Sequence, residues 1–296
     1  MNEQRFVSPA ARLRHRLSRD DILVAPGVFD AWSARLTERA GFESIYMTGF
    51  GTAASLLGVP DLGLVTATEM ADHASRLSQA VGVPVIADAD TGFGDLLNVQ
   101  RTMRLYERAG VGAIQLEDQI SPKRCGHMED KQVVPASEMV RRIRAAREAC
   151  SDPEMVIIAR TDARATDGLD EALRRGEQYL AAGADMLFVE APQSDAELHA
   201  VCDAFRGEWL LANVVEAGKT PYHAADELQA MGFRLAIFPI SSLLAATRAV
   251  AEGLREIREH GRLTGETAYV DFGTFNQLMG LEDYIRAARD LAGHDQ

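Results

Sequence analysis

The chain has 296 residues, of which 47% are hydrophobic and 25% are charged, the proportions of an ordinary globular protein. Its formal net charge of −13 argues against a nucleic-acid surface, which needs a basic stripe, although local arginines could still hold a small anionic substrate. Three scattered cysteines are too few for a disulfide framework, and no apolar run approaches the ~20 residues of a membrane span. We therefore expect a soluble, cytoplasmic protein whose partners are neither nucleic acid nor membrane.

Residues 1–21 are predicted to hold a short N-terminal helix. Ser8 suits the N-cap and Pro9 suits the first helical position. The arginines that follow could suggest a transit peptide, but the stretch also holds Glu3 and Asp20 and lacks the apolar segment of a secretory signal. A helix that docks on the domain is the preferred interpretation.

One pattern recurs along the chain: a helical stretch ends in Ala-Gly or a similar pair, and a short apolar run follows. Glycine suits the left-handed position just past a helix C-terminus. Short apolar runs between helices are typical of parallel strands that are covered on both faces. Eight such runs are predicted as strands, namely Ile22–Ala25, Ser44–Thr48, Val83–Ala87, Ala113–Leu116, Met155–Ala159, Met186–Val189, Trp209–Ala212 and Leu235–Phe238.

Amphipathic helices are predicted between these strands, with good examples at Leu97–Arg108, Ser137–Cys150 and Leu169–Ala182. Eight strand–helix units predict an α/β fold, a (β/α)8 TIM-type barrel. A doubly wound open sheet is the alternative, but it would usually have fewer strands and a glycine fingerprint after the first. No internal linker interrupts residues 1–296, so we expect a single domain.

Residues 243–296 form an extension that the barrel does not need. A long helix is predicted at Leu243–His260 and another at Leu281–Ala292. We expect this C-terminal helical extension to pack on a neighbouring subunit.

Polar residues stand at the end of almost every predicted strand, where barrels of this kind carry their chemistry. In chain order they are Asp30, Thr48-Gly49, Asp88 and Asp90, Glu117-Asp118, Arg160 and Asp162, Glu190, and Asn213. The convergence of carboxylates, arginine and amide at one end of the barrel is a stronger signal than any single member.

Three of these acids are candidates for a metal site. Asp88 and Asp90 alternate along an extended segment and should point to the same face, next to Glu117 of the following strand. Like charges at that spacing would repel unless a cation neutralised them or some were protonated. Hard oxygen ligands favour Mg²⁺ or Mn²⁺ over zinc. The alternative is that acids here cap the following helices, and for Asp118 and Asp162 we prefer capping or a supporting role.

The stretch from Lys123 to His127 brings together cationic side chains and a thiol. Arg124 and His127 would lower the pKa of Cys125 and make it a proton donor or a nucleophile, unless the stretch is merely a solvated basic loop. Arg124 and Arg160 could hold substrate carboxylates, although Arg160 could instead pair with acids near it. A metal, carboxylate clamps and a thiol suit a reaction in which the metal stabilises an enolate oxygen and an acid or base acts at carbon.

With these residues in view, the chain resembles the isocitrate lyase/phosphoenolpyruvate mutase superfamily. The 2-methylisocitrate lyase, 2,3-dimethylmalate lyase and carboxyphosphonoenolpyruvate mutase branches look closest. The resemblance runs from about Ala25 to the C-terminal helices, and its motifs occupy residues 48–49, 57–63, 88–94, 117–119, 123–127, 159–163 and 213–216.

The resemblance implies a barrel whose eighth helix is swapped between subunits, usually in a homotetramer. It implies a metal site at Asp61, Asp88, Asp90 and Glu117, with Asp88 the direct ligand and the other acids acting largely through water. The substrate residues that it implies are Tyr46, Thr48 and Gly49 for the pyruvate- or glyoxylate-like end, Arg160 for the carboxylate of that end, and Arg124, Gly126, His127, Glu190 and Asn213 for the rest.

The resemblance assigns catalytic roles to Cys125, Arg160, Glu117 and His127, with Cys125 protonating the departing carbanion. One departure concerns Phe50, which follows Gly49 where the methylisocitrate lyases have a glycine. An aromatic side chain there should reshape the pocket for the substrate.

The resulting hypothesis is a Mg²⁺-dependent carbon–carbon lyase that cleaves a small anionic 2-hydroxy di- or tricarboxylate to pyruvate or glyoxylate. A phosphonomutase acting on a P–C bond is one alternative. Another is an oxaloacetate hydrolase or decarboxylase, although the branches with those activities commonly lack the cysteine. A non-catalytic barrel that senses a small acid would belong to a different class altogether.

Overall fold

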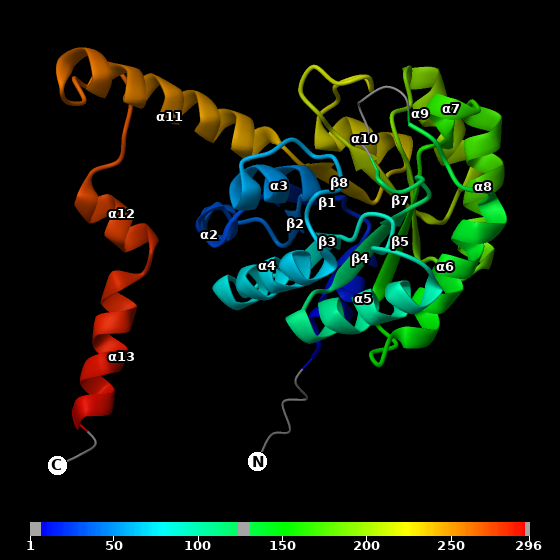
Figure 1. Cartoon of the computed structure of the whole chain (residues 1–296), viewed down its shortest axis with the longest axis horizontal. Coiled ribbons are helices and arrows are strands. Elements are labelled where there is room, and N and C mark those ends of the chain that lie inside the picture. Colours follow the sequence, from blue (N-terminus) through cyan, green and yellow to red (C-terminus); the bar gives the residue numbers. More distant parts are fainter. Residues whose placement is uncertain (1–6, 124–130, 294–296) are drawn as a thin grey trace.

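The computed structural model describes residues 7–123 and 131–293 and contains a closed barrel of eight parallel strands in sequence order (Figure 1). The predicted (β/α)8 fold is therefore confirmed. The strands are β1 Leu23–Val28, β2 Ile45–Met47, β3 Val85–Asp88, β4 Ala113–Glu117, β5 Val156–Thr161, β6 Met186–Val189, β7 Trp209–Asn213 and β8 Leu235–Phe238.

Several strands extend further than their apolar runs. The β4–β5 ladder continues through Leu116 opposite Ala159 to Glu117 opposite Arg160. Because backbone hydrogen bonding does not depend on side-chain polarity, the last rungs hold the polar residues that the sequence placed just after the strands. Asp88, Glu117, Arg160 and Asn213 are thus strand residues, which fixes their backbones more firmly than a loop would.

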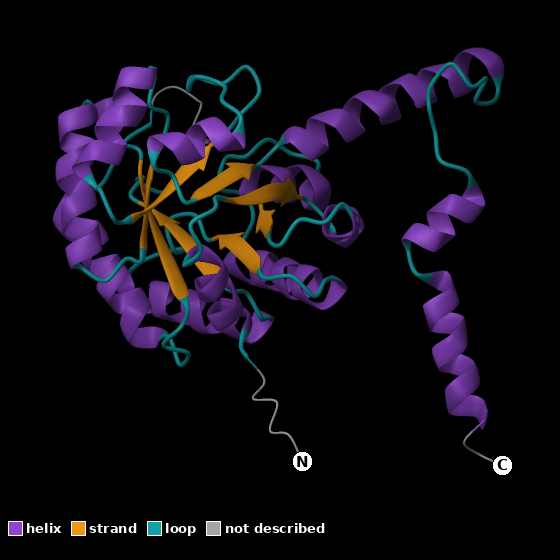
Figure 2. Cartoon of the chain, turned by 180° about the vertical axis from the view of Figure 1, so that it is seen from behind, coloured by secondary structure: helices purple, strands orange, loops and turns teal. Residues whose placement is uncertain are grey.

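Helices surround the barrel (Figure 2), except for the last three, which extend away from it. Each predicted helix is present to within two residues at either end. In order they are α1 Pro9–Leu17, α2 Ala31–Arg39, α3 Gly49–Leu57, α4 Ala67–Ala80, α5 Leu96–Ala109, α6 Ala136–Ala149, α7 Ala163–Thr166, α8 Leu169–Ala181, α9 Asp195–Ala204, α10 Ala225–Met231, α11 Ser241–His260, α12 Phe272–Leu278 and α13 Leu281–Gly293.

Helix α1 packs against the N-terminal ends of the strands, as the docking-helix prediction requires. Ser8 caps it by accepting a hydrogen bond from the Ala11 N–H at 3.1 Å. Leu13 and Leu17 are buried with the residues that begin the strands, such as Leu23. The opposite end of the barrel, where the strands finish, is left for the polar side chains.

The C-terminal helices α11, α12 and α13 extend away from the barrel and form an arm, residues 241–293 (Figures 1 and 2). Helix α11 projects outward from the barrel, and the chain then turns into α12 and α13. The arm meets α2 where Arg35 NH1 donates to the Met279 carbonyl at 3.1 Å. Apolar side chains of the arm are exposed, namely Leu244, Val250, Leu254, Ile257, Tyr269, Phe272, Phe275, Leu281, Tyr284, Ile285 and Leu291. Within the described residues, no helix is both long enough and apolar enough to cross a membrane.

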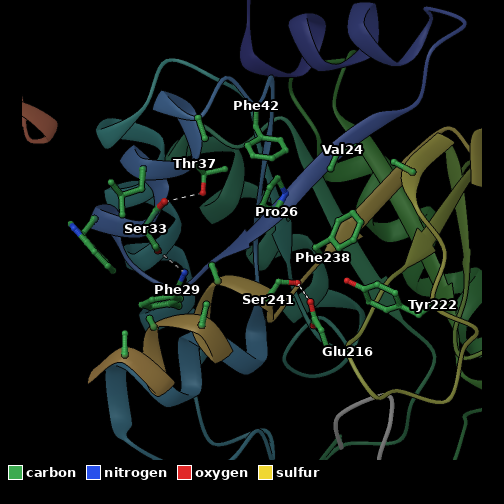
Figure 3. Close-up of a pocket in the computed structure, with 18 residues that line it drawn as sticks. Val24, Pro26, Phe29, Ser33, Thr37, Phe42, Glu216, Tyr222, Phe238 and Ser241 are labelled. Carbon is green, nitrogen blue, oxygen red and sulfur yellow. Dashed lines mark hydrogen bonds between the residues drawn. The ribbon is translucent and has the colours of Figure 1, made fainter. Parts of the chain in front are cut away.

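A cavity of about 750 Å³ opens on the barrel wall between α2, strands β1 and β8, and the start of α11 (Figure 3). Its lining is mostly apolar and includes Phe29, Phe42 and Phe238. A wall helix would normally cover this part of a barrel, and α11 points away from it instead.

Candidate active site

Asp88 lies at the centre of the polar end of the barrel as the last residue of β3. Its Oδ2 accepts a hydrogen bond from the Gly49 N–H at 3.2 Å, and its Oδ1 accepts one from the Asp90 N–H at 3.0 Å. A Cβ at position 49 would lie 2.5 Å from Asp88 Oδ2, so glycine is required there. The sequence thus brings the end of β3 directly against the N-terminus of α3.

Asp90 also lies at this end, but not in the way that the alternation predicted. The strand stops at Asp88, and Asp90 has a φ of 47°, in the left-handed region that residues other than glycine rarely adopt. The prediction of one extended segment with both side chains on the same face is therefore wrong in its backbone geometry. Both carboxylates are nevertheless buried at the polar end of the barrel, where the strands finish and which we call the mouth.

Lys123 is the main residue of the site that the sequence interpretation missed. Its Nζ lies 2.7 Å from Asp61 Oδ1 and 2.8 Å from Asp90 Oδ1, with 5% of the side chain exposed. Burial alone would lower the pKa of Lys123, but Asp90, Asp88, Glu117 and Asp61 raise it well above its usual value, so the ammonium stays charged.

The composition holds a signal that could have drawn attention to this position. The chain has 31 basic residues, of which only Lys123, Lys131 and Lys219 are lysines. Two of the three flank the stretch that carries Cys125. A compact ammonium can sit among several carboxylates where a planar guanidinium would be too large.

The acids fit a divalent cation by their chemistry. Burial raises the pKa of Asp90 to about 7 despite the nearby Lys123, and it raises that of Glu117 well above its usual value despite Arg160. Glu117 Oε1 is buried without a hydrogen-bond partner among the described residues. The cluster is thus short of positive charge, which Mg²⁺ would supply.

The predicted tight group of three carboxylate ligands does not form in the described part of the chain. No three His, Cys, Asp or Glu side chains there are arranged so as to hold a metal ion. Lys123 forms ion pairs with Asp61 and Asp90 instead, and its single positive charge offsets only one of the two carboxylates. This arrangement fits a metal ion that Asp88 binds directly and that the other acids contact through water. The family resemblance implied the same set of ligands.

Replacing Lys123 by methionine should destabilise the metal-free protein by ~3–5 kcal/mol, because two buried carboxylates lose their cation. Urea unfolding measures the loss, and Mg²⁺ should raise the melting temperature of the variant more than that of the wild type. Arg248→Met removes a cation whose side chain is 83% exposed and should change stability by less than ~1 kcal/mol. Equal stability of the two variants would refute the role of Lys123.

Arg160 lies across the mouth at the end of β5 and is held mainly by Asp162. Its Nε and NH2 donate to the two carboxylate oxygens of Asp162 at 2.9 and 3.0 Å. Glu117 and Glu190 are further from the guanidinium, at 3.5 and 3.8 Å, and its CZ lies 5.1 Å from the centre of the Phe188 ring. The predicted alternative, an ion pair of Arg160 with nearby acids, is present.

Asp118 and Asp162 support the site rather than capping a helix. Asp162 precedes α7, but its side chain makes no capping hydrogen bond there. Asp118 Oδ1 accepts the Asp162 N–H at 2.9 Å, and its Oδ2 accepts from Thr161 and Tyr179, both at 2.7 Å. Of the two roles that the sequence left open, the supporting role is the one present.

The ion pairs of Asp162 should make the protein sensitive to acid. Arg160 and Lys131 outweigh the effect of burial and lower the pKa of Asp162 from 3.8 to about 2. A carboxylate whose pKa falls on folding contributes stability that is complete above its unfolded pKa and is lost as the pH falls through the folded one. Unfolding free energy should therefore decline between about pH 4 and pH 2, and Asp162→Asn should flatten that decline.

Urea midpoints measured across this window test the prediction. Asp203→Asn, which removes an exposed ion pair with Arg206, is the control and should leave the acid slope unchanged. The same slope in Asp162→Asn and wild type would contradict the assignment.

The residues predicted for the pyruvate- or glyoxylate-like end of the substrate lie on β2 and at the N-terminus of α3. Thr48 caps α3 by accepting the Gly51 N–H at 3.2 Å, and Phe50 lies half-buried in the first turn. Tyr46 is buried and donates to Gln115 Oε1 at 2.8 Å, so its hydroxyl proton is already engaged. Gln115 was not predicted, and its Nε2 also lies 3.4 Å from Asp88 Oδ1.

Glu190 and Asn213 complete the mouth on the side of β6 and β7. Asn213 Nδ2 donates to Glu190 Oε2 at 3.2 Å, while Asn213 Oδ1 is buried with no hydrogen-bond partner among the described residues. The predicted residues Arg124, Cys125, Gly126 and His127 lie outside the described residues.

The family model described as phosphoenolpyruvate phosphomutase matches residues 13–258. The chain is 47% identical over 277 residues to 2,3-dimethylmalate lyase of Eubacterium barkeri, covering 93% of this chain and 96% of that protein. It is 45% identical over 252 residues to 2-methylisocitrate lyase of Bacillus subtilis (strain 168), covering 85% and 82%.

Solved structures are also similar to this chain over nearly its whole length. Oxaloacetate acetylhydrolase in complex with the inhibitor 3,3-difluorooxalacetate superposes with a TM-score of 0.92 at 38% identity, covering 97% of this chain and 98% of that one. A phosphonopyruvate hydrolase complex with oxalate and Mg²⁺ superposes with a TM-score of 0.85 at 29% identity, covering 96% and 98%.

Proposed function

Because the chain belongs to the phosphoenolpyruvate mutase/isocitrate lyase superfamily, we propose that it is a Mg²⁺-dependent carbon–carbon lyase. Its substrate is a 2-hydroxy di- or tricarboxylate of the 2,3-dimethylmalate or 2-methylisocitrate type. The products are pyruvate, or glyoxylate, and a second carboxylic acid. The proposal rests chiefly on one observation. Arg160 lies at the same barrel mouth as the buried acids Asp88, Asp90 and Glu117.

The two sides of the mouth divide the work. Arg160 binds the carboxylate of the pyruvate-like end by charge-assisted hydrogen bonds. Asp88 would hold Mg²⁺ directly, with Asp90, Glu117 and Asp61 acting largely through water, and the ion would supply a Lewis acid for the negative charge that develops on the substrate oxygen. The N-terminus of α3 lies against Asp88, to which the Gly49 N–H donates, and the positive end of its helix dipole favours anionic groups there.

The proposed cleavage runs in the retro-aldol direction and needs no oxidant. A base takes the proton of the substrate hydroxyl, the C–C bond breaks, and the oxygen becomes the carbonyl of pyruvate or glyoxylate. The electron pair of the broken bond stays on the departing carboxylic acid, and the Cys125 thiol protonates that carbon.

One solved relative and the family model favour two alternative functions. The likeness to oxaloacetate acetylhydrolase favours oxaloacetate hydrolysis as an alternative. The family model favours a P–C bond phosphonomutase as another. Cys125 supports the lyase over the oxaloacetate activity, because the branches of the family with that activity commonly lack the cysteine.

A panel of acids distinguishes these activities. Dimethylmalate, methylisocitrate, isocitrate, citramalate and oxaloacetate are incubated with the protein and Mg²⁺, and pyruvate, glyoxylate and oxalate are quantified. We expect pyruvate or glyoxylate from one or more of the hydroxy acids and no activity after chelation. Release of oxalate from oxaloacetate, with every hydroxy acid inert, would favour the hydrolase.

We further propose a homotetramer in which a second copy of the chain covers the open barrel wall. The cavity beside α2 is apolar, and the arm exposes apolar side chains such as Leu254, Phe272 and Tyr284. A swapped C-terminal helix from the second copy would bury both surfaces. Light scattering should give a mass four times the chain mass of 32.3 kDa, and a monomer in solution would contradict the proposal.

A further inference from the structure

The carboxylate of Asp162 is shared between two cations from different parts of the chain. Arg160 takes both oxygens through Nε and NH2, and Lys131 Nζ approaches Oδ1 at 2.6 Å. The Asp162 side chain is fully buried, and 2% of the Lys131 side chain is exposed. A carboxylate at this depth is held only because both cations compensate it.

The arrangement fixes the plane and the direction of the Arg160 guanidinium. Two parallel N–H···O bonds to one carboxylate define the orientation of a planar group, which a single bond would not. Every hydrogen bond and ion pair that Arg160 makes with the described residues runs through Nε or NH2. NH1 is therefore the nitrogen left for a ligand.

Asp162 is itself held in place by Asp118. Its N–H donates to Asp118 Oδ1, and Asp118 Oδ2 accepts from Arg175 NH1 at 3.0 Å and from the Tyr179 hydroxyl. The chain of contacts runs from α8 through Asp118 to the start of α7 and ends on Arg160. Rigid elements thus set the position of the carboxylate on which Arg160 depends.

We propose that Asp162, compensated by Lys131, is a positioning residue that aims Arg160 at the substrate carboxylate. The inference rests on the proposed function of the site, in which Arg160 binds that carboxylate. Without Asp162, Arg160 would be drawn toward Glu117 and Glu190, which stand 3.5 and 3.8 Å away. Its guanidinium would then pair with acids of the site instead of the ligand.

The probe is oxalate with Mg²⁺, measured by titration calorimetry, because oxalate carries the two-carbon anionic end of the proposed products. Asp162→Asn should raise the Kd of oxalate at least ~10-fold. Glu197→Gln is the matched control: it removes another bidentate pair of the described residues, with Arg164 of α7 at 2.6 and 2.8 Å, which makes no hydrogen bond or ion pair with Arg160. It should leave the Kd unchanged.

A double-mutant cycle separates positioning from a general structural effect. In an Arg160→Met background, oxalate binds weakly, and adding Asp162→Asn should weaken it no further, since the residue through which Asp162 acts is gone. Additive losses would overturn the inference. So would equal oxalate affinity of folded Asp162→Asn and wild type.

Melting temperatures establish that each variant is folded. If Asp162→Asn does not fold, Asp162→Glu keeps the charge that Lys131 needs but moves the carboxylate by one carbon, and it should also weaken oxalate. Wild-type protein that binds no oxalate with Mg²⁺ would refute the proposed function and this inference together. Wild-type binding with an unaffected Asp162 variant would refute the inference alone.

Discussion

Replacing Cys125 by serine should lower kcat by ~10²–10⁴-fold, the usual contribution of a general acid, while substrate affinity stays within about threefold. A hydroxyl is a far weaker acid than a thiol, so the carbanion left by C–C cleavage would lack its proton donor. Serine is close to cysteine in size, so substrate contacts should persist. Steady-state kinetics and the Kd of oxalate measure the two effects separately.

The other two cysteines provide matched controls. Burial raises the pKa of both Cys150 and Cys202 to about 11. Cys150 directly follows α6 and Cys202 lies within α9, and neither belongs to the polar end of the barrel. Serine at either position should leave kcat within about twofold. Undiminished turnover in Cys125→Ser would remove the thiol from the proposed reaction.

Asp88→Asn should lower kcat by about 10²-fold or more and weaken Mg²⁺ binding measurably. The carboxylate accepts the Gly49 and Asp90 N–H groups with its two different oxygens. An amide must turn its NH₂ toward one of these donors, and it also removes the negative charge proposed to bind the ion. The variant thus tests both the local hydrogen bonding and the metal assignment.

Calorimetric titration with Mg²⁺ reports the second effect without reference to turnover. Asp95→Asn is the control, because Asp95 ends the loop that follows Asp88 and caps α5 through the Leu96 N–H. It should retain both activity and Mg²⁺ affinity. Wild-type Mg²⁺ affinity in Asp88→Asn would show that the ion, if bound, is held elsewhere.

The barrel could be predicted from the sequence because its signals are local. Each apolar run and each glycine after a helix indicates an element without reference to distant residues. The ends of the strands could not be placed in the same way. The pairing of Glu117 with Arg160 depends on the register between β4 and β5. That register cannot be read from the sequence of either strand alone.

The sequence predicted which residues lie at the polar end of the barrel, but not which of them contact one another. Asp88, Asp90, Glu117, Arg160 and Asn213 do meet at one mouth, since parallel strands end there together. The pairing of Lys123 with Asp61 joins residues 62 positions apart and depends on how two loops pack. Periodicity carries no information on such contacts, so the ammonium among the acids was missed.

The two lysines beside the Cys125 stretch illustrate the same limit. Lys123 contacts the acid side of the mouth and Lys131 contacts the arginine side through Asp162. Each partner is reached only in three dimensions. The scarcity of lysine in an arginine-rich chain was visible beforehand, yet it could not have named Asp61, Asp90 or Asp162 as the partners.

Proton NMR of the reaction in D₂O tests the central claim most directly. With Mg²⁺ and a cleaved 2-hydroxy acid, the lyase predicts pyruvate or glyoxylate and the second carboxylic acid in equal amounts. It also predicts one solvent deuteron at the carbon that carried the broken bond. Oxalate and acetate as the only products formed, and from oxaloacetate alone, would contradict the lyase.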